Sequence, residues 1–206
     1  MTPSAIFPAI CTYSGKDLTV VCDLHSACQL VKGRVYMCGV AGSKYPVLEF
    51  DGVKTKADED KGFESRSSVD AIAIPPSQSS ICFVELKSWG LPLSDKPTET
   101  KITKKAAKYA SSLPRKLSDS IEICREIIGA SDAFEGCRIV YVLLTDISVE
   151  DNGLESLEAD LSALAGISSN FNHLCNELSK NIMAGIPDVE SRYWECREFD
   201  NNILTL

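Results

Sequence analysis

The chain has 206 residues, of which 44% are hydrophobic and 24% are charged, and it carries a formal net charge of −8 at pH 7. This length suits a single well-buried domain that spans residues 1–206. The acidic balance argues against a protein that coats nucleic acid non-specifically, although a local basic surface can still hold a phosphate backbone. The longest apolar run, residues 139–144, is far shorter than a membrane-spanning helix, so we expect no association with a membrane.

The cysteine content indicates the compartment. The nine cysteines are an odd number, and the N-terminus has neither the basic nor the long apolar region of a secretory signal. We therefore predict a protein of the reducing cytoplasm, in which cysteine acts mainly as a small core residue. One short region gathers zinc-type ligands at a spacing that fits no common zinc module, and core cysteines explain it equally well. These residues are Cys22, His25, Cys28 and Cys38.

The N-terminal part of the chain gives mixed signals. Residues 17–32 fit either a helix or, over residues 19–22, a β-strand. Residues 44–50 are predicted to form a short extended segment that ends at the turn signal Asp51-Gly52. Residues 54–61 are polar and charged almost throughout, which predicts an exposed loop.

The middle of the chain is clearer. Residues 69–74 and 81–89 are two β-like runs joined by a proline- and serine-rich link, which predicts a β-hairpin. A helical region follows. It is predicted to consist of two parts, residues 101–113 and residues 117–128, separated at Pro114.

The last part begins after Gly129, the predicted end of the helical region. Residues 138–145 form a continuous apolar run of β-favouring residues, which is typical of a strand covered on both faces. Leucines repeat at helical spacing over residues 154–178 and predict one long helix or two. Residues 192–199 are predicted to be an edge strand.

The order hairpin, helix, buried strand and helix predicts the fold class. It indicates an α/β (α+β) domain with a central mixed β-sheet flanked by helices. The core is expected over about residues 44–146, and a C-terminal helical region over about residues 153–180.

Charges inside apolar strands mark the candidate site. A strand tolerates Glu85 and Lys87 only at its end, in an ion pair or around a bound ion, because a buried unpaired charge costs several kcal/mol. Their two-residue spacing places both on one face, roughly 6.5 Å apart. Antiparallel pairing brings Asp70, at the head of the first strand, beside them. Two carboxylates and an ammonium then converge, which suits Mg²⁺ and the hydrolysis of a phosphodiester.

The pattern Asp70 … Glu85-Leu86-Lys87 resembles the core motif of the PD-(D/E)xK nuclease superfamily. The resemblance covers about residues 64–89 by motif. It implies a restriction-endonuclease-like core and an endonuclease that depends on Mg²⁺ or Mn²⁺, with DNA favoured over RNA. In that family the acidic pair holds the metal and the lysine assists the attacking water. These roles fall on Asp70, Glu85 and Lys87, with the Leu86 carbonyl as a further ligand.

The chain departs from the family pattern in places. Val69 stands where many members have proline, and Lys105 stands four residues before Tyr109, where RecB-like members have glutamine. Many members carry an additional acidic metal ligand on an upstream helix. The candidates for that ligand here are Glu64 and Glu49.

A basic segment follows the catalytic strand. We expect it to hold the phosphate backbone, and the alternative is an ordinary solvated helix face. The predicted nucleic-acid contacts are Lys101, Lys104, Lys105, Lys108, Arg115 and Lys116.

The acidic charge and the leucine stripe over residues 154–178 favour a second hypothesis. The chain would then be a non-catalytic nuclease-fold module that binds a partner protein, and the same stripe suits a homodimer. Under the nuclease hypothesis, a stand-alone domain of this kind suits a bacterial or phage defence or conflict system, by analogy alone.

Overall fold

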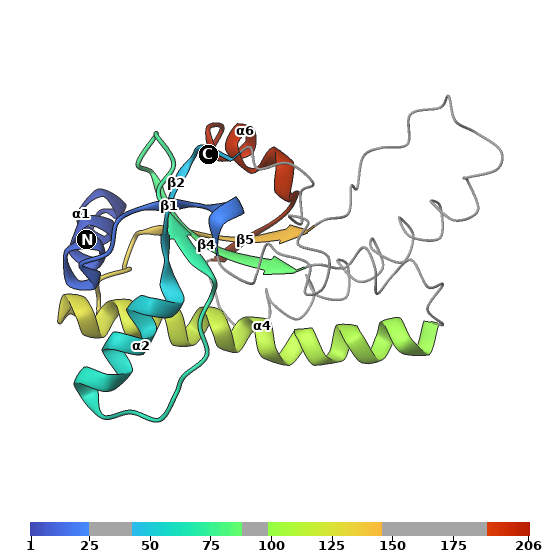
Figure 1. Cartoon of the computed structure of the whole chain (residues 1–206), viewed down its shortest axis with the longest axis horizontal. Coiled ribbons are helices and arrows are strands. Elements are labelled where there is room, and N and C mark those ends of the chain that lie inside the picture. Colours follow the sequence, from blue (N-terminus) through green and yellow to red (C-terminus); the bar gives the residue numbers. More distant parts are fainter. Residues whose placement is uncertain (25–42, 88–98, 146–188) are drawn as a thin grey trace.

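The computed structural model describes residues 1–24, 43–87, 99–145 and 189–206, and side chains are not described for residues 99–107, 110, 111 and 145 (Figure 1). Six strands form one mixed sheet in the order β1-β2-β3-β4-β5-β6. The elements are α1 (Pro3–Ser14), β1 (Thr19–Val20), η1 (Val21–Asp23), β2 (Pro46–Glu49), α2 (Phe50–Lys61), β3 (Ala71–Ala73), β4 (Ser80–Lys87), α4 (Glu99–Ile128), β5 (Arg138–Thr145), β6 (Val189–Glu195), η2 (Cys196–Glu198) and α6 (Phe199–Ile203).

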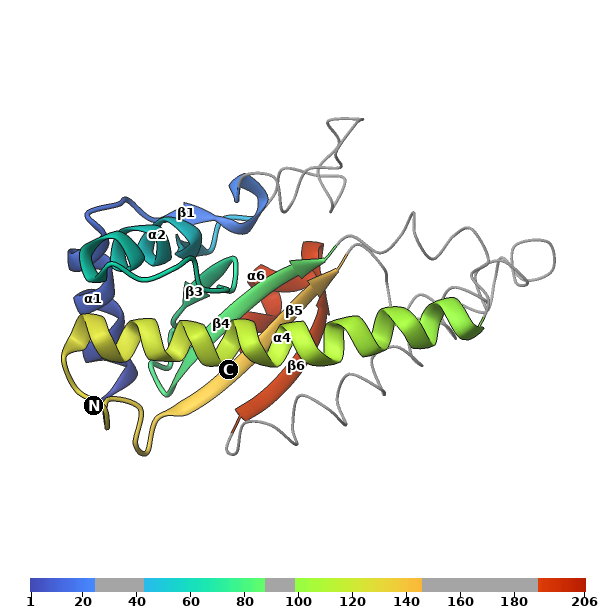
Figure 2. The same cartoon turned by 90° about the horizontal axis from the view of Figure 1, so that it is seen from below.

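The sheet changes direction at β4. Strands β1 to β4 pair antiparallel, whereas β4, β5 and β6 pair parallel. Helix α4 makes the crossover from β4 to β5 and lies along one face of the sheet (Figure 2). The predicted mixed sheet with flanking helices is confirmed. No helix in the described ranges is long and apolar enough to cross a membrane.

Two cores enclose the sheet, one on each face. On the face covered by α1, α2 and α4, the core includes Phe83 and Tyr141. On the other face, Val84 and Val142 pack with Phe199 of α6. Since side chains alternate along a strand, residues 81, 83 and 85 of β4 face α4 and residues 82, 84 and 86 face α6.

Helix α2 corrects one prediction, because residues 54–61 are helical and not an exposed loop. Phe50, Val53 and Ala57 are buried along one side of the helix, a stripe that the intervening charges conceal in the sequence. Gly62 ends the helix in the left-handed region at φ 67°. Asp58 is also buried, and it pairs with Arg66 at 2.7 Å.

Helix α4 corrects a second prediction. It runs without interruption through Pro114, where the sequence predicts a break between two helices. Leu113, Leu117 and Cys124 are buried in the same core on both sides of the proline, so packing on the sheet keeps the two halves in line. Gly129, at φ 74°, follows the last helical residue as expected.

The predicted hairpin is confirmed as β3 and β4, and the strand buried on both faces is confirmed as β5. The predicted edge strand over residues 192–199 is confirmed only for residues 192–195, which belong to β6 at the end of the sheet, because residues 196–199 are helical in η2 and α6. Near residue 20 the chain forms the short strand β1 followed by η1, and no long helix begins there within the described residues. Helix α1 was not predicted. The leucine stripe and the helical region 153–180 lie outside the described residues, as do His25, Cys28 and Cys38, while Cys22 is buried.

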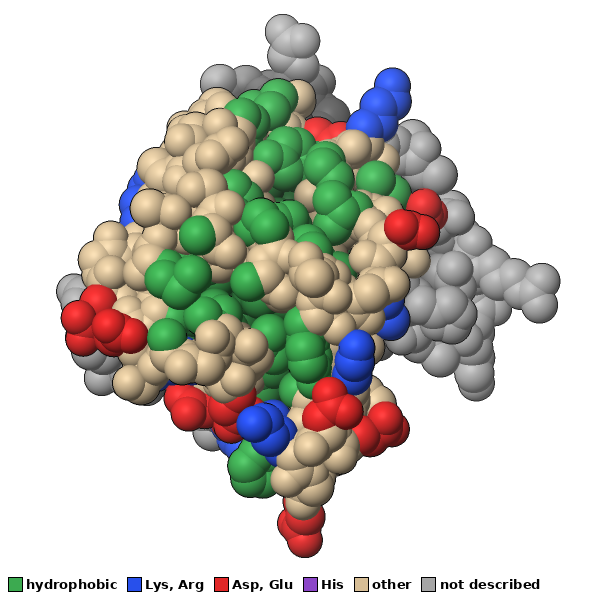
Figure 3. All heavy atoms as spheres, turned by 90° about the vertical axis from the view of Figure 1, so that its left-hand side faces the viewer, with side chains coloured by type: hydrophobic (Ala, Val, Ile, Leu, Met, Phe, Trp, Pro, Cys, Tyr) green, Lys and Arg blue, Asp and Glu red, His purple; other side chains and the backbone are tan. Residues whose placement is uncertain are grey.

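The end of the molecule formed by α1 is poor in charge. No residue of α1 is acidic or basic. Figure 3 shows hydrophobic side chains gathered over much of this face, with charged side chains mainly toward its edges. A phosphate backbone needs lysine or arginine, so this face is unsuited to nucleic acid.

Candidate functional site

The β3–β4 hairpin places Asp70 beside Glu85. Ala71 pairs with Val84, and the N–H of Asp70 donates to the Val84 carbonyl at 3.0 Å. The Asp70 carboxylate in turn accepts a hydrogen bond from the N–H of Leu86 at 2.7 Å. The expected convergence of Asp70 with the Glu85–Lys87 end of β4 is confirmed.

Glu85 has no exposed side-chain surface. Its carboxylate accepts hydrogen bonds from Lys87 and from Lys116, the latter at 2.8 Å and 3.1 Å to its two oxygens. Lys87 also donates to the Leu86 carbonyl at 3.2 Å. A fully buried carboxylate is expensive unless opposite charges compensate it, and here two ammonium groups do so.

Lys116 reaches the site from α4, the helix that covers the sheet face toward which Glu85 points. Its Nζ lies 4.0 Å from Oδ1 of Asp70 in addition to its bonds with Glu85. Burial on its own would lower the pKa of Lys116, but the charges of Glu85 and Asp70 outweigh it and raise that pKa above its ordinary value. Lys116 therefore stays charged and bridges the two carboxylates.

Asp70 is the carboxyl group that the site perturbs most clearly. Burial, followed by the negative charge of Glu85, raises its pKa from 3.8 to about 6. Lys116, the Leu86 N–H and Lys87 lower that pKa in part. Two carboxylates thus share a poorly hydrated space, and any added cation would favour the ionised form of Asp70.

Tyr141 adds an unexpected group. It lies in β5 opposite Phe83 and is 1% exposed, and its hydroxyl has no hydrogen-bond partner among the described residues. Burial and then the charges of Glu85 and Asp70 raise the pKa of Tyr141, whose side chain lies on the same face of the sheet as Glu85. A buried hydroxyl normally has a partner, because leaving it without one costs about 1–3 kcal/mol. The sequence conceals this donor inside an apolar run.

Glu49 and Glu64 are the sequence candidates for the upstream acidic ligand, and a third acidic residue, Asp51, acts on the charged cluster. Glu49 pairs with Lys16 at 2.5 Å, and the strand alternation turns it to the sheet face opposite Asp70. Glu64 is exposed in the segment between α2 and β3. Asp51, in the first turn of α2, accepts a hydrogen bond from Ser68 at 2.6 Å, and its charge helps to raise the pKa of Lys116. The Asp51-Gly52 turn signal concealed its helical position.

The predicted basic contacts divide into two groups. Lys116 points into the acidic site, whereas Lys108 is exposed and Arg115 is 70% exposed beside Asp119. The backbone of the first half of α4 extends past the carboxyl ends of β4 and β5 (Figures 1 and 2). That half carries the remaining three residues, whose side chains lie outside the described set: Lys101, Lys104 and Lys105.

The donor set suits a hard divalent cation. Asp70, Glu85 and the Leu86 carbonyl supply oxygen, which Mg²⁺ and Mn²⁺ prefer. No group of three or more His, Cys, Asp or Glu side chains that could hold a metal occurs in the described ranges. A bound Mg²⁺ would therefore keep several waters, as it usually does. The Tyr141 hydroxyl, which has no hydrogen-bond partner among the described residues, is a buried donor suited to such hydration, so the residues fit the ion.

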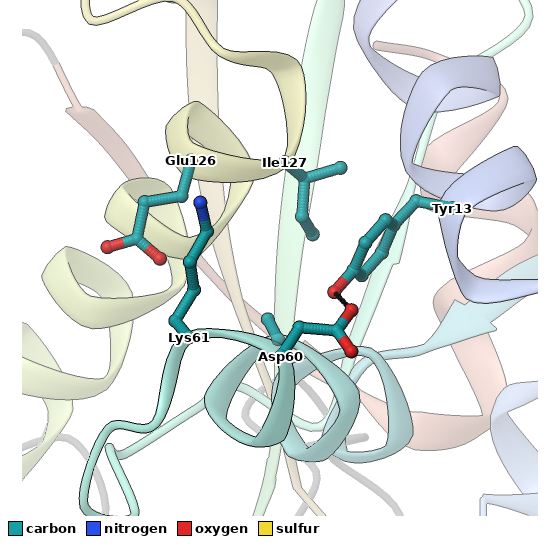
Figure 4. A pocket seen from close by; sticks show the side chains of 6 residues that line it. Tyr13, Asp60, Lys61, Glu126 and Ile127 are labelled. Atoms are coloured by element: carbon teal, nitrogen blue, oxygen red, sulfur yellow. Dashed lines mark hydrogen bonds between the residues drawn. The ribbon is translucent and has the colours of Figure 1, made fainter.

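A separate hollow lies between α1, α2 and the end of α4 (Figure 4). Its volume is about 340 Å³, and Tyr13 donates a hydrogen bond to Asp60 across it at 2.5 Å. Glu126 also lines it, ten residues after Lys116 on the same helix and hence roughly 15 Å away along its axis. The hollow and the carboxylate pair are therefore distinct places.

Comparison with known proteins gives no further guide to this site. No protein-family model, curated protein or solved structure matches the chain. The resemblance to the PD-(D/E)xK superfamily thus stays a prediction from its motif. The geometry of Asp70, Glu85, Lys87 and Lys116 is therefore the main guide to the function of the chain.

Proposed function

We propose that this protein is a metal-dependent endonuclease with a restriction-endonuclease-like core, of the kind that the PD-(D/E)xK resemblance implies. The observation that carries the proposal is the fully buried carboxylate of Glu85, held beside Asp70 and against two lysines at the end of β4. Placing four ionisable groups together between an apolar sheet and the helix that covers it is costly, whereas a hydrophobic replacement is often neutral or stabilising. Chemistry on a charged substrate gives a reason to retain them.

Charge balance supports a role for a divalent cation. Asp70 and Glu85 offset Lys87 and Lys116, so the four groups sum to no net charge when all are ionised. A bound divalent ion would add two positive charges, which suits a phosphodiester and its more negative transition state. Asp70, Glu85 and the Leu86 carbonyl would hold Mg²⁺ or Mn²⁺, with Asp51, whose charge acts on Lys116, as a further acidic residue.

The metal, when bound, polarises the phosphate and lowers the pKa of water. The residues of the chain orient the reaction. Lys87 lies at the end of β4 with 22% of its side chain exposed, so its ammonium can meet both the buried carboxylate and a substrate arriving from solvent. There it positions the attacking water and offsets the charge that grows on phosphate. The Leu86 N–H holds the Asp70 carboxylate in its orientation.

DNA is the substrate that we favour. The lysines of the projecting half of α4 would hold its phosphate backbone while the site cuts, although the protein as a whole is acidic. Cys11, Cys82, Cys124 and Cys137 are free thiols, which supports a place in the reducing cytoplasm. A bacterial or phage defence or conflict system is the setting that we propose for such an activity.

The test is cleavage of supercoiled plasmid DNA with Mg²⁺ or Mn²⁺, with EDTA as the metal-free control. We expect the wild type to nick or linearise the plasmid. Lys87→Met and Asp70→Asn should lose at least 99% of the rate while remaining folded by circular dichroism. Asp132→Asn, which changes an exposed aspartate in the turn after α4, should cut like the wild type. Absence of cleavage of DNA and of RNA with either metal would refute the proposal.

One observation favours the alternative of a non-catalytic module that binds a partner protein. Every charge of the cluster already has an opposite partner within the chain, as a structural ion network would. In that case the wild type would cleave nothing, and Glu85→Gln would leave partner binding unchanged. A homodimer or a partner held by the leucine stripe of residues 154–178 belongs to the same alternative.

A further inference from the structure

Lys116 is the one member of the charged cluster that the motif does not contain. The hairpin supplies the other three, whereas Lys116 comes from the middle of α4. Its ammonium contacts both oxygens of Glu85, at 2.8 Å and 3.1 Å, and lies 4.0 Å from Asp70. With 27% of its side chain exposed, it is held between the carboxylates rather than extended into solvent.

This position conflicts with that of a metal ion. A divalent cation bound by Asp70 and Glu85 needs the same carboxylate oxygens, at the 2.0–2.1 Å typical of Mg²⁺. An ammonium on those oxygens would repel a divalent ion strongly in a poorly hydrated site. The two lysines differ in this respect. Lys87 has the Leu86 carbonyl as a second acceptor, whereas the Lys116 ammonium contacts Glu85 and Asp70 alone among the described residues.

We propose that Lys116 is the resident cation of the metal-free site, that it keeps the two carboxylates together, and that a divalent ion must displace it in order to bind. The inference rests on the proposed function. The flexible four-carbon stem of lysine allows the ammonium to leave without moving α4, and the displaced charge is then free to meet a phosphate oxygen. Lys116 is in this sense a positioning residue that lowers the affinity for metal.

The experiment is a titration of the metal-free, 206-residue protein with Mn²⁺ alone, measured by isothermal titration calorimetry. Lys116→Met removes the competing charge and keeps most of the side-chain volume. We expect it to bind Mn²⁺ at least tenfold more tightly than the wild type. The matched control is Arg115→Met, which removes one positive charge from the adjacent position of the same helix, where the side chain is 70% exposed. It should stay within twofold of the wild type.

A second pair of variants guards against loss of the fold. Lys116→Gln keeps a hydrogen-bond donor for Glu85 without the charge, and it should also bind Mn²⁺ more tightly. Lys116→Arg keeps the charge and should bind no more tightly than the wild type. A purely structural lysine predicts the opposite result, because its loss would loosen the site and weaken metal binding.

The outcomes separate the two proposals. If the wild type binds Mn²⁺ and cleaves DNA, but the neutral variants bind Mn²⁺ equally or more weakly, Lys116 does not compete with metal and only this inference fails. If the wild type neither binds Mn²⁺ nor cleaves DNA or RNA, the nuclease proposal fails and this inference falls with it. Tighter binding in both neutral variants, with Lys116→Arg no tighter than the wild type, supports both proposals.

Discussion

Asp70→Asn should yield a protein that is more stable and inactive. Asp70 is mostly buried, and its pKa is about 6 in the folded protein against 3.8 for an ordinary aspartate. The folded state therefore binds the proton more tightly, so this group adds stability below pH 3.8 and loses that contribution as the pH rises through about 6. At pH 8 the folded state carries the full cost of the buried charge, about 3 kcal/mol for a shift of this size.

Asparagine avoids that cost, since it is neutral at every pH and its side-chain oxygen still accepts from the Leu86 N–H. Part of the gain is offset, because Lys116 loses one of its two carboxylates. We therefore expect the free energy of unfolding at pH 8 to rise by roughly 1–3 kcal/mol. Between pH 5 and pH 8, Asp70 should lower the stability of the wild type by about 1 kcal/mol, a change that is missing from the variant.

Urea denaturation of the metal-free protein at pH 5 and pH 8 measures these differences. Asp132→Asn serves as the control for an exposed aspartate. Millimolar Mg²⁺ should stabilise the wild type at pH 8 and leave Asp70→Asn nearly unchanged, because the ion favours the ionised carboxyl. The reasoning is refuted if Asp70→Asn is less stable than the wild type at pH 8, or if the difference between them does not depend on pH.

Three further substitutions test other parts of the structure. Glu85→Ala leaves two lysines without their buried partner and should lower the free energy of unfolding in urea by roughly 3–5 kcal/mol; a loss below 1 kcal/mol would show that the cluster is hydrated. Tyr141→Phe removes a buried hydroxyl that has no partner among the described residues, so stability should stay equal or rise by about 1 kcal/mol while the cleavage rate falls; a clear loss of stability would mean that the hydroxyl has a partner. Gly62→Ala places a side chain at φ 67° and should lower the melting temperature through a loss of about 1 kcal/mol, whereas an unchanged melting temperature would show that the cap tolerates alanine.

Local patterns predicted the parts of the site that depend on local geometry. Period-two alternation and a turn between two apolar runs are enough to pair β3 with β4, and this pairing sets Asp70 beside Glu85. The face shared by Glu85 and Lys87 follows from the same alternation. None of this requires knowledge of the rest of the chain.

The missing parts depend on how distant elements pack. The role of Lys116 depends on the rotation of α4 over the sheet, and seven basic residues between positions 96 and 116 give no means of selecting one of them. Asp51 was concealed because a charged segment with a glycine resembles a loop until the buried stripe of α2 is known. Tyr141 lies in a continuous apolar run and is predicted as a core residue, and only the structure shows that its hydroxyl has no partner in the described part of the chain.

Pro114 divides α4 into two mechanical parts. Proline has no N–H, so the helix lacks one main-chain hydrogen bond at this point, and bending concentrates at such a position. The following part, with Lys116, is fixed to the sheet by Leu117 and Cys124. The preceding part, residues 99–113, is roughly 22 Å long at the helical rise, and its first turns extend past the carboxyl ends of β4 and β5 (Figure 2). A force on the first part of α4 is therefore taken up by bending at Pro114. The position of Lys116 against Asp70 and Glu85 then stays the same when that part of the helix binds another molecule.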